Sequence, residues 1–190
     1  MNLTFVDEKH QYFLDEKPIP SVTQILGLAN LYEFVNAKLM DRASKFGTAV
    51  HKATELYDLG RLDYDSLDAA LMPYLEAWIK FLNDTGFKIE CIEEKIYSQF
   101  GYAGTLDRIG YLNGKLTLLD IKTTTSIMKT NALQLAAYKN AWQEMHDKTI
   151  DQIVCVQLKP LKYSMKKYND PNDFMMFLQF LNVYKWVHND

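Results

Sequence analysis

The sequence of 190 residues predicts a single α/β domain with a helical N-terminal part. Hydrophobic residues make up 48% and charged residues 24% of the chain, as in globular proteins. Apolar residues recur at helical spacing up to about residue 85, and strand-like alternation begins at residue 87. We therefore expect one domain over residues 1–190. Residues 1–85 would form a hairpin and helices, and residues 86–190 an αβ core.

The N-terminal part contains one hairpin pattern followed by helical patterns. Residues 3–14, "LTFVDEKHQYFL", predict a hairpin whose turn lies in the charged segment 7–10. Ser21 is placed to cap a short helix that ends near Gly27. Residues 31–59 predict two helices with a break near residues 46–47, stopped by Gly60. Apolar residues at helical spacing predict a further helix over residues 66–83, which "DTG" ends.

The second half alternates between strand and helix patterns. "FKIECIEEKIYSQ" reads as a strand, and "YAGTLDRIGYL" and "KLTLLDIKT" flank the dipeptide Asn113-Gly114, which suits a type I′ hairpin turn. A helix is expected over residues 131–146, then the strand "QIVCVQLKP" and a final helix over residues 172–187. The stretch "LKPLKYSMKK" is a local basic run, either a solvated face or a set of phosphate contacts.

Bulk properties exclude several classes of protein. The formal net charge of −3 gives no global attraction to nucleic acid, so any positive charge must be local or carried by metal. The two cysteines, Cys91 and Cys155, are too few for an iron–sulfur cluster and read as reduced core residues. No signal-peptide pattern or membrane-length apolar stretch occurs. We expect a soluble cytoplasmic protein, in the bacterial host if it is encoded by a phage.

Four short motifs carry chemically useful residues in a fixed order. "GTAVH" ends at His51 on a predicted helix, and "GTLD" ends at Asp107 before the Asn-Gly turn. "DIK" follows that turn in the next strand, and "QLAAY" lies on the following helix. Each motif is weak alone, because a single helix histidine or surface ion pair is common. Together they predict one site.

The predicted hairpin register brings two carboxylates together. A two-residue turn at 113–114 pairs residue 112 with residue 115, and counting outward places Asp107 opposite Asp120 on one face. Like charges in that position repel unless a cation lies between them, and Mg²⁺ prefers oxygen ligands. Lys122 shares the face of Asp120 because side chains alternate along a strand. These residues predict half of a metal site beside a lysine that stabilises phosphate charge.

This arrangement resembles the PD-(D/E)XK nuclease superfamily, and within it the RecB-like exonuclease branch. "GTAVH" is similar to the branch's Gly-x-x-x-His motif, "GTLD" to its second motif, "DIKT" to its Asp-x-Lys core and "QLAAY" to its Gln-x-x-x-Tyr motif. Upstream, "IPSVTQIL" resembles the mitochondrial genome maintenance exonucleases and their phage and bacterial relatives. The resemblance implies a restriction-endonuclease-like core, in which helices flank a mixed sheet.

The resemblance also implies metal-dependent hydrolysis of phosphodiester bonds. Asp107, Asp120, the Ile121 carbonyl and the His51 ring would bind Mg²⁺ or Mn²⁺. Lys122 would position the attacking water. With Asp107 and Asp120, it would form the catalytic set.

Other residues receive supporting roles on the same basis. Gln134 and Tyr138 would brace the site or touch the DNA backbone. Thr123 either donates to a phosphate or is a β-favouring residue. Glu55, four residues after His51 on one helix face, is either close to the site or a surface charge. Glu94 either approaches the metal or is a solvated or structural residue.

The expected function is a metal-dependent DNA exonuclease that acts on single-stranded DNA or ends, in phage or bacterial repair, recombination or processing. The sequence lacks the four-cysteine pattern of an iron–sulfur cluster, so no cluster is implied. It also lacks a Gly-x-x-x-x-Gly-Lys loop, so no nucleotide site is implied. Two alternatives stay open. One is a catalytically inactive module of the same fold that binds DNA or assembles with other proteins. The other is an endonuclease or ribonuclease.

Overall fold

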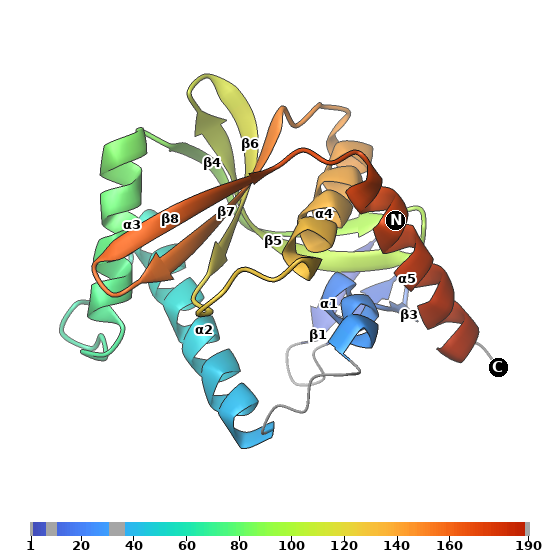
Figure 1. Ribbon diagram of the computed structural model, residues 1–190, viewed down its shortest axis with the longest axis horizontal. Coiled ribbons are helices and arrows are strands. Elements are labelled where there is room, and N and C mark those ends of the chain that lie inside the picture. The colour runs from blue at the N-terminus through green and yellow to red at the C-terminus, as the bar shows by residue number, and fades with distance from the viewer. Residues whose placement is uncertain (1, 7–10, 31–36, 189–190) are drawn as a thin grey trace.

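A computed structural model describes residues 2–6, 11–30 and 37–188 of the chain. A five-stranded sheet forms its centre (Figure 1). Helices α2 (Ala37–Asp58) and α3 (Met72–Thr85) cover one face of the sheet. Helices α4 (Thr130–His146) and α5 (Asn172–His188) lie on the other side. The protein is therefore an α/β structure in which helices flank a mixed sheet, as the sequence predicts.

The central sheet has the order β4-β5-β6-β7-β8. Its strands are β4 (Lys88–Ser98), β5 (Tyr102–Leu112), β6 (Lys115–Lys122), β7 (Gln152–Lys159) and β8 (Lys162–Tyr168). Strands β6 and β7 are parallel, and all other neighbours are antiparallel. A parallel pair needs a crossover connection, and α4 supplies it.

The β5–β6 hairpin has the predicted register. Asn113 and Gly114 both have positive φ, +53° and +75°, as a type I′ turn requires. Leu112 pairs with Lys115, and the ladder continues outward to Arg108 opposite Leu119. The next positions along this register are 107 and 120, so both aspartates lie where the hairpin ladder ends.

A small sheet precedes the central one. Strands β1 (Leu3–Val6) and β2 (Gln11–Leu14) form the expected hairpin, whose turn lies outside the described residues. A third strand, β3 (Lys17–Ile19), was not predicted from the sequence. Ser21 caps α1 (Val22–Leu26) in a capping box with Gln24, and a 3₁₀ turn, η2 (Gly27–Asn30), follows. The Ala103 N–H donates to the Pro20 carbonyl and joins this part to β5.

Two helix predictions need correction. The break expected at residues 46–47 is absent, because α2 continues through them. Gly47 instead permits a close approach: a Cβ there would lie 3.3 Å from Oγ1 of Thr123. The next helix begins at Met72 and not at residue 66, with Pro73 in its first turn. Its end at Gly86, with φ +61°, is as expected.

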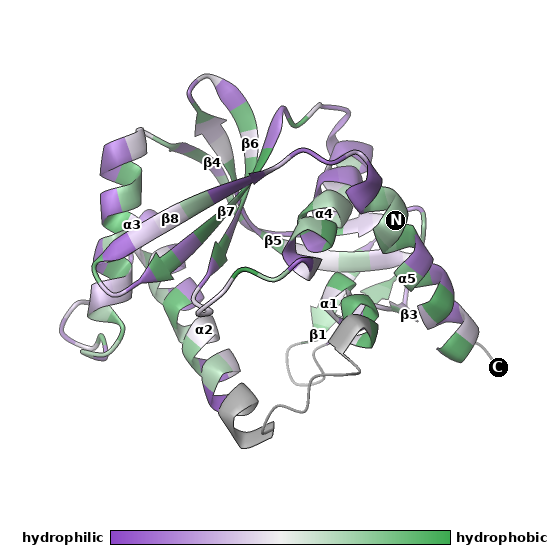
Figure 2. Cartoon of the chain, viewed as in Figure 1, coloured by the Kyte–Doolittle hydropathy of each residue, from purple (hydrophilic) through white to green (hydrophobic). Residues whose placement is uncertain are grey.

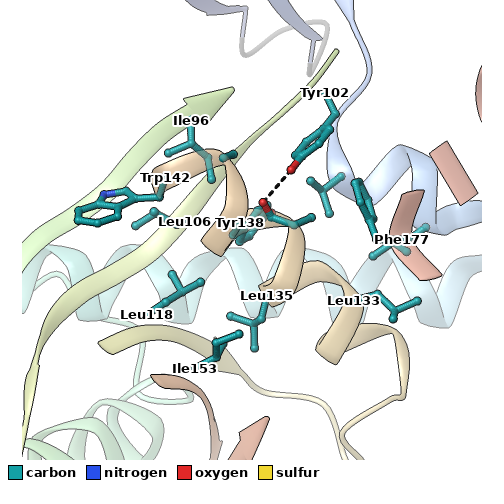
Figure 3. Close-up of a cluster of buried hydrophobic side chains, with 14 of the residues drawn as sticks. Ile96, Tyr102, Leu106, Leu118, Leu133, Leu135, Tyr138, Trp142, Ile153 and Phe177 are labelled. Carbon is teal, nitrogen blue, oxygen red and sulfur yellow. Dashed lines mark hydrogen bonds between the residues drawn. The ribbon is translucent and has the colours of Figure 1, made fainter. Parts of the chain in front are cut away.

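Each face of the sheet has its own apolar core. The cluster toward α4 and α5 includes Leu106, Leu135 and Phe177, and the Tyr102 hydroxyl donates to the Ala137 carbonyl within it (Figure 3). The cluster toward α2 and α3 includes Trp78 and Phe81. Trp78 and Phe81 stack with their ring centroids 5.1 Å apart. The two layers of helices pack against opposite faces of the sheet and so hold in place the strand ends that carry the motifs.

The basic run "LKPLKYSMKK" is largely an edge strand. β8, which was not predicted, pairs only with β7 and is largely hydrophilic in Figure 2. Lysines on an edge strand discourage pairing with other chains. Within the described ranges, the structure contains no helix long and apolar enough to cross a membrane.

Candidate active site

Three side chains from three elements converge beside the end of the β5–β6 ladder. His51 comes from α2, Glu93 from β4 and Asp107 from β5. One ligand atom of each lies within 4.8 Å of the others, and among the described residues no other such group of three forms. His51 Nδ1 is 3.4 Å from Oδ1 of Asp107. A helix and two neighbouring strands therefore hold one cluster of possible metal ligands.

The remaining predicted residues lie on the adjacent strand. The Ile121 N–H donates to Oδ2 of Asp107 at 2.6 Å, and the Lys122 ammonium donates to Oδ1 of Asp120 at 2.9 Å. Asp107 and Asp120 are 7% and 2% exposed. The structure thus brings together the aspartates, His51 and Lys122, as expected. In this state Asp120 is paired with the lysine and lies outside the three-ligand cluster.

The acidic residue of β4 at the site is Glu93, and the sequence reasoning considered Glu94 instead. Glu94 accepts from Trp142 Nε1 at 2.9 Å and pairs with His146 Nε2 at 2.6 Å, so it belongs to the contact between β4 and α4. Glu93 has a φ of +51°, which is uncommon for a residue with a side chain. Such strained backbone is often retained at functional sites.

A second residue missed from the sequence is Arg108, which is fully buried directly after Asp107. Its guanidinium donates to Asp58 at 2.8 Å and to Glu93 at 3.0 Å. Asp58 also accepts from Trp78 Nε1. The sequence signal for this residue was an arginine within an otherwise apolar strand, because such an arginine needs carboxylate partners from other elements.

Burial and neighbouring charges shift the pKa values of the site in different directions. Burial would raise the pKa of Asp107, but the charge and hydrogen bond of His51, with Lys122, lower it to about 2. Burial raises the pKa of Asp120 to about 6 against the opposing charge of Lys122. Burial and the nearby Asp107 raise the pKa of Glu93 to about 7. Burial lowers the pKa of His51, but the neighbouring carboxylates, Asp107 above all, raise it by more in total, so the net shift is upward.

The charges of this network fit a divalent cation. Four carboxylates, on Asp58, Glu93, Asp107 and Asp120, share two permanent cations, Arg108 and Lys122. The four ionised carboxylates therefore exceed these two cations by two charges, of which a protonated His51 would balance one, and the raised pKa values of Asp58, Glu93 and Asp120 favour their protonated forms. Carboxylate oxygens and one imidazole suit Mg²⁺ or Mn²⁺. His51, Glu93 and Asp107 would hold the ion, with Asp120 released from Lys122 as a further ligand.

A cleft of about 630 Å³ gives access to the cluster. His51, Glu93 and Tyr138 line it, and so do Phe5, Tyr12, Ser21, Thr23, Thr48, Lys52, Glu55, Lys95, Gly104 and Thr105. Glu55 pairs with Lys52 at 2.8 Å. The small N-terminal sheet therefore forms one wall and α2 another.

The fourth motif braces the site through packing. Gln134 Nε2 donates to the Tyr138 hydroxyl at 3.1 Å. The ring of Tyr138 lies against Gly104 of the "GTLD" motif, since a Cβ there would come within 2.5 Å of Cε1. Likewise, Gly47 of "GTAVH" contacts Thr123, the residue after "DIK". Glycines of two motifs thus leave room for side chains of the other two.

Comparisons with known proteins identify no family for this chain. No family model matches the chain, and no curated protein matches it. Among solved structures, the chain is similar to a crystal structure of SSO0001 at 16% identity, with a TM-score of 0.40. The match covers 89% of this chain and 85% of that one. At this level of similarity it carries no functional argument.

Proposed function

We propose that this protein is a metal-dependent nuclease of the PD-(D/E)XK type, and specifically an exonuclease acting on DNA. The observation that carries the proposal is the cluster of His51, Glu93 and Asp107 beside Asp120 and Lys122. Three of the four motifs supply this cluster apart from Glu93, and the fourth braces it, in the order that the RecB-like branch has. The restriction-endonuclease-like core and Mg²⁺ or Mn²⁺ as cofactor belong to the same proposal.

The chain's own residues divide the work of phosphodiester hydrolysis. A bound divalent cation would lower the pKa of a water ligand and polarise the phosphate. His51, Glu93, Asp107 and Asp120 would hold that ion, with the Ile121 carbonyl as a further oxygen donor. Lys122 leaves Asp120 and turns toward the attacking water and the phosphate charge. Tyr138, held by Gln134, fixes the wall of the cleft.

The cleft favours a single strand as substrate. Phe5 and Tyr12 line the wall opposite α2, and Lys95 lies over the Phe5 ring at 5.9 Å from its centroid. Aromatic and basic side chains along one groove suit stacked bases and backbone phosphates. On the α2 side, Lys52 is paired with Glu55, so this pair adds no net charge to the cleft. We therefore propose single-stranded DNA or DNA ends, processed in the cytoplasm during phage or bacterial repair or recombination.

The rival function is an inactive module of the same fold that only binds DNA. The intact set of Asp107, Asp120 and Lys122 weighs against it, because a role in binding alone does not require two buried carboxylates beside a lysine. An endonuclease or ribonuclease would use the same residues, so it is separated by substrate and not by geometry.

The test is a degradation assay with Mg²⁺ or Mn²⁺ on four substrates of one sequence: end-labelled linear single-stranded DNA, linear duplex, circular single-stranded DNA and RNA. The proposal expects fast release of label from linear single strands and little cleavage of circles. Cleavage of circular DNA would make the protein an endonuclease, and preference for RNA a ribonuclease. Binding to DNA without cleavage in either metal would support the inactive module.

A further inference from the structure

We infer that Arg108 is a positioning residue that aims the Glu93 carboxylate at the metal cluster. The inference rests on the proposed function and assigns Arg108 a role that none of the four motifs gives it. Arg108 Nη1 donates to Oε1 of Glu93 at 3.0 Å and to the Asp107 carbonyl at 2.7 Å. One nitrogen thus links two strands at the point where each presents a candidate ligand.

The guanidinium is itself held rigidly. Its Nε donates to Oδ2 of Asp58 at 2.8 Å, and its Nη2 donates to Oγ1 of Thr54 at 3.2 Å. The guanidinium carbon lies 5.7 Å from the centroid of the Trp78 ring. Arg108 and the Asp58 side chain are 0% and 1% exposed. A planar guanidinium with this many partners is held in one orientation, so its hydrogen bond to Glu93 has a fixed direction.

The backbone of Glu93 explains why such a bond is needed. A φ of +51° costs of order 1 kcal/mol or more for a residue with a Cβ, and an unrestrained strand would relax out of it. The Glu93 side chain is 29% exposed, so packing alone holds it weakly. The charge-assisted hydrogen bond from Arg108 therefore restrains the Glu93 side chain.

The same contact keeps α2 in place relative to β4. Thr54 and Asp58 lie on α2, about one and two turns after His51. Arg108 therefore joins the helix that carries His51 to the strands that carry Glu93 and Asp107. Partners that orient metal ligands typically contribute about 10- to 100-fold to metal affinity.

The experiment measures Mn²⁺ affinity by calorimetry in the absence of DNA. Arg108→Lys keeps the positive charge but cannot reach all the partners, and Glu93→Gln removes the carboxylate that Arg108 would aim. Leu112→Ala serves as a matched control, because Leu112 is buried at the opposite end of β5. If Arg108→Lys does not fold, Asp58→Asn/Arg108→Met replaces it, since that pair leaves no unpaired buried charge.

We expect Arg108→Lys to weaken Mn²⁺ binding about 10-fold or more, while Leu112→Ala, despite a lower Tm, binds Mn²⁺ as wild type does. Adding Glu93→Gln to Arg108→Lys should weaken binding by less than about 2-fold further, because the two changes remove one interaction. Wild-type affinity in Arg108→Lys, or losses that multiply in the double variant, would overturn the inference. So would a wild type that binds no Mn²⁺. A wild type that binds Mn²⁺ and cleaves no DNA would contradict the proposed function alone.

Discussion

Gly104 lies so close to the ring of Tyr138 that a β-carbon on it would be 2.5 Å from Cε1. The two residues belong to different motifs, "GTLD" and "QLAAY", on strand β5 and helix α4. Tyr138 is 5% exposed and is held by Gln134. Burial and the hydrogen bond from Gln134 therefore hold the ring against Gly104. The spacing of the motifs reflects contact between them.

This contact predicts that Gly104→Ala is destabilising by about 1–3 kcal/mol, the usual cost of overpacking. Chemical denaturation of the variant and of wild type measures the difference. Tyr138→Leu in the Gly104→Ala background should recover part of the loss, because the smaller side chain leaves room for the methyl group. Equal stability of Gly104→Ala and wild type would show that the ring has another position available.

A second prediction concerns pH and the metal-free protein. The pKa of Asp120 is raised to about 6 and that of Glu93 to about 7, so the folded state binds these protons more tightly than the unfolded state. Their stabilisation is complete at low pH and is lost as pH rises through the folded values. The low pKa of Asp107, about 2, has the opposite sign, but its contribution is constant above about pH 5.

The free energy of unfolding in EDTA should therefore fall between pH 5 and pH 8, at about 1.4 kcal/mol per unit of pKa difference for an isolated group. Urea denaturation at the two pH values measures the fall. The variant Glu93→Gln/Asp120→Asn should lose the part that these two groups contribute, and the part due to His51, whose pKa is also raised, should remain. Mn²⁺ at pH 8 should raise stability again, because it binds only the folded state. Metal-free stability that is level or rises over this range would contradict the charge arrangement.

The third prediction separates the role of Lys122 from that of the ligands. Lys122→Ala should lower turnover about 100- to 1,000-fold at saturating Mn²⁺, because a positioned donor to the developing charge is lost. Mn²⁺ affinity should be unchanged or higher, since the variant frees Asp120 from its 2.9 Å ion pair. Single-turnover kinetics and calorimetry give the two quantities.

Lys52→Ala is the matched control for that experiment. Lys52 lines the same cleft but is paired with Glu55, and we expect turnover within a few fold of wild type. If Lys122→Ala binds Mn²⁺ poorly yet cleaves normally once saturated, then the lysine supports the metal and does not act on the phosphate.

The sequence predicted the parts of the site that follow from one well-defined turn. Asn113 and Gly114 determine the β5–β6 register, which is as counted as far as Arg108 opposite Leu119, one pair short of Asp107 and Asp120. The turn between β4 and β5 has one glycine, Gly101 with φ +84°, and does not define the register as an Asn-Gly pair does, so Glu93 was not placed opposite Asp107. The positive φ at Glu93 could not be read from the sequence either. Glu93 was missed for these reasons.

Arg108 was missed because alternation along β5 is interrupted. Leu106 and Arg108 are two residues apart and should share a face. Leu106 instead packs in the cluster toward α4 and α5, and Arg108 contacts Trp78 and Asp58 on the α2 and α3 side. Strand β8 was missed for a simpler reason: its lysines and exposed positions lack the apolar alternation of an inner strand.

The most direct test of the account is cleavage of end-labelled single-stranded DNA by wild type and Asp107→Asn, each with Mn²⁺ and with EDTA. Asp107 touches both His51 on α2 and the Ile121 N–H on β6, so it links the helix and the strand that carry proposed ligands. We predict that wild type cleaves the DNA with Mn²⁺ and does not cleave it with EDTA, and that the variant cleaves it in neither condition. Circular dichroism confirms that both are folded. Cleavage by wild type in EDTA, or by Asp107→Asn at the wild-type rate, would contradict a metal-dependent nuclease centred on this residue.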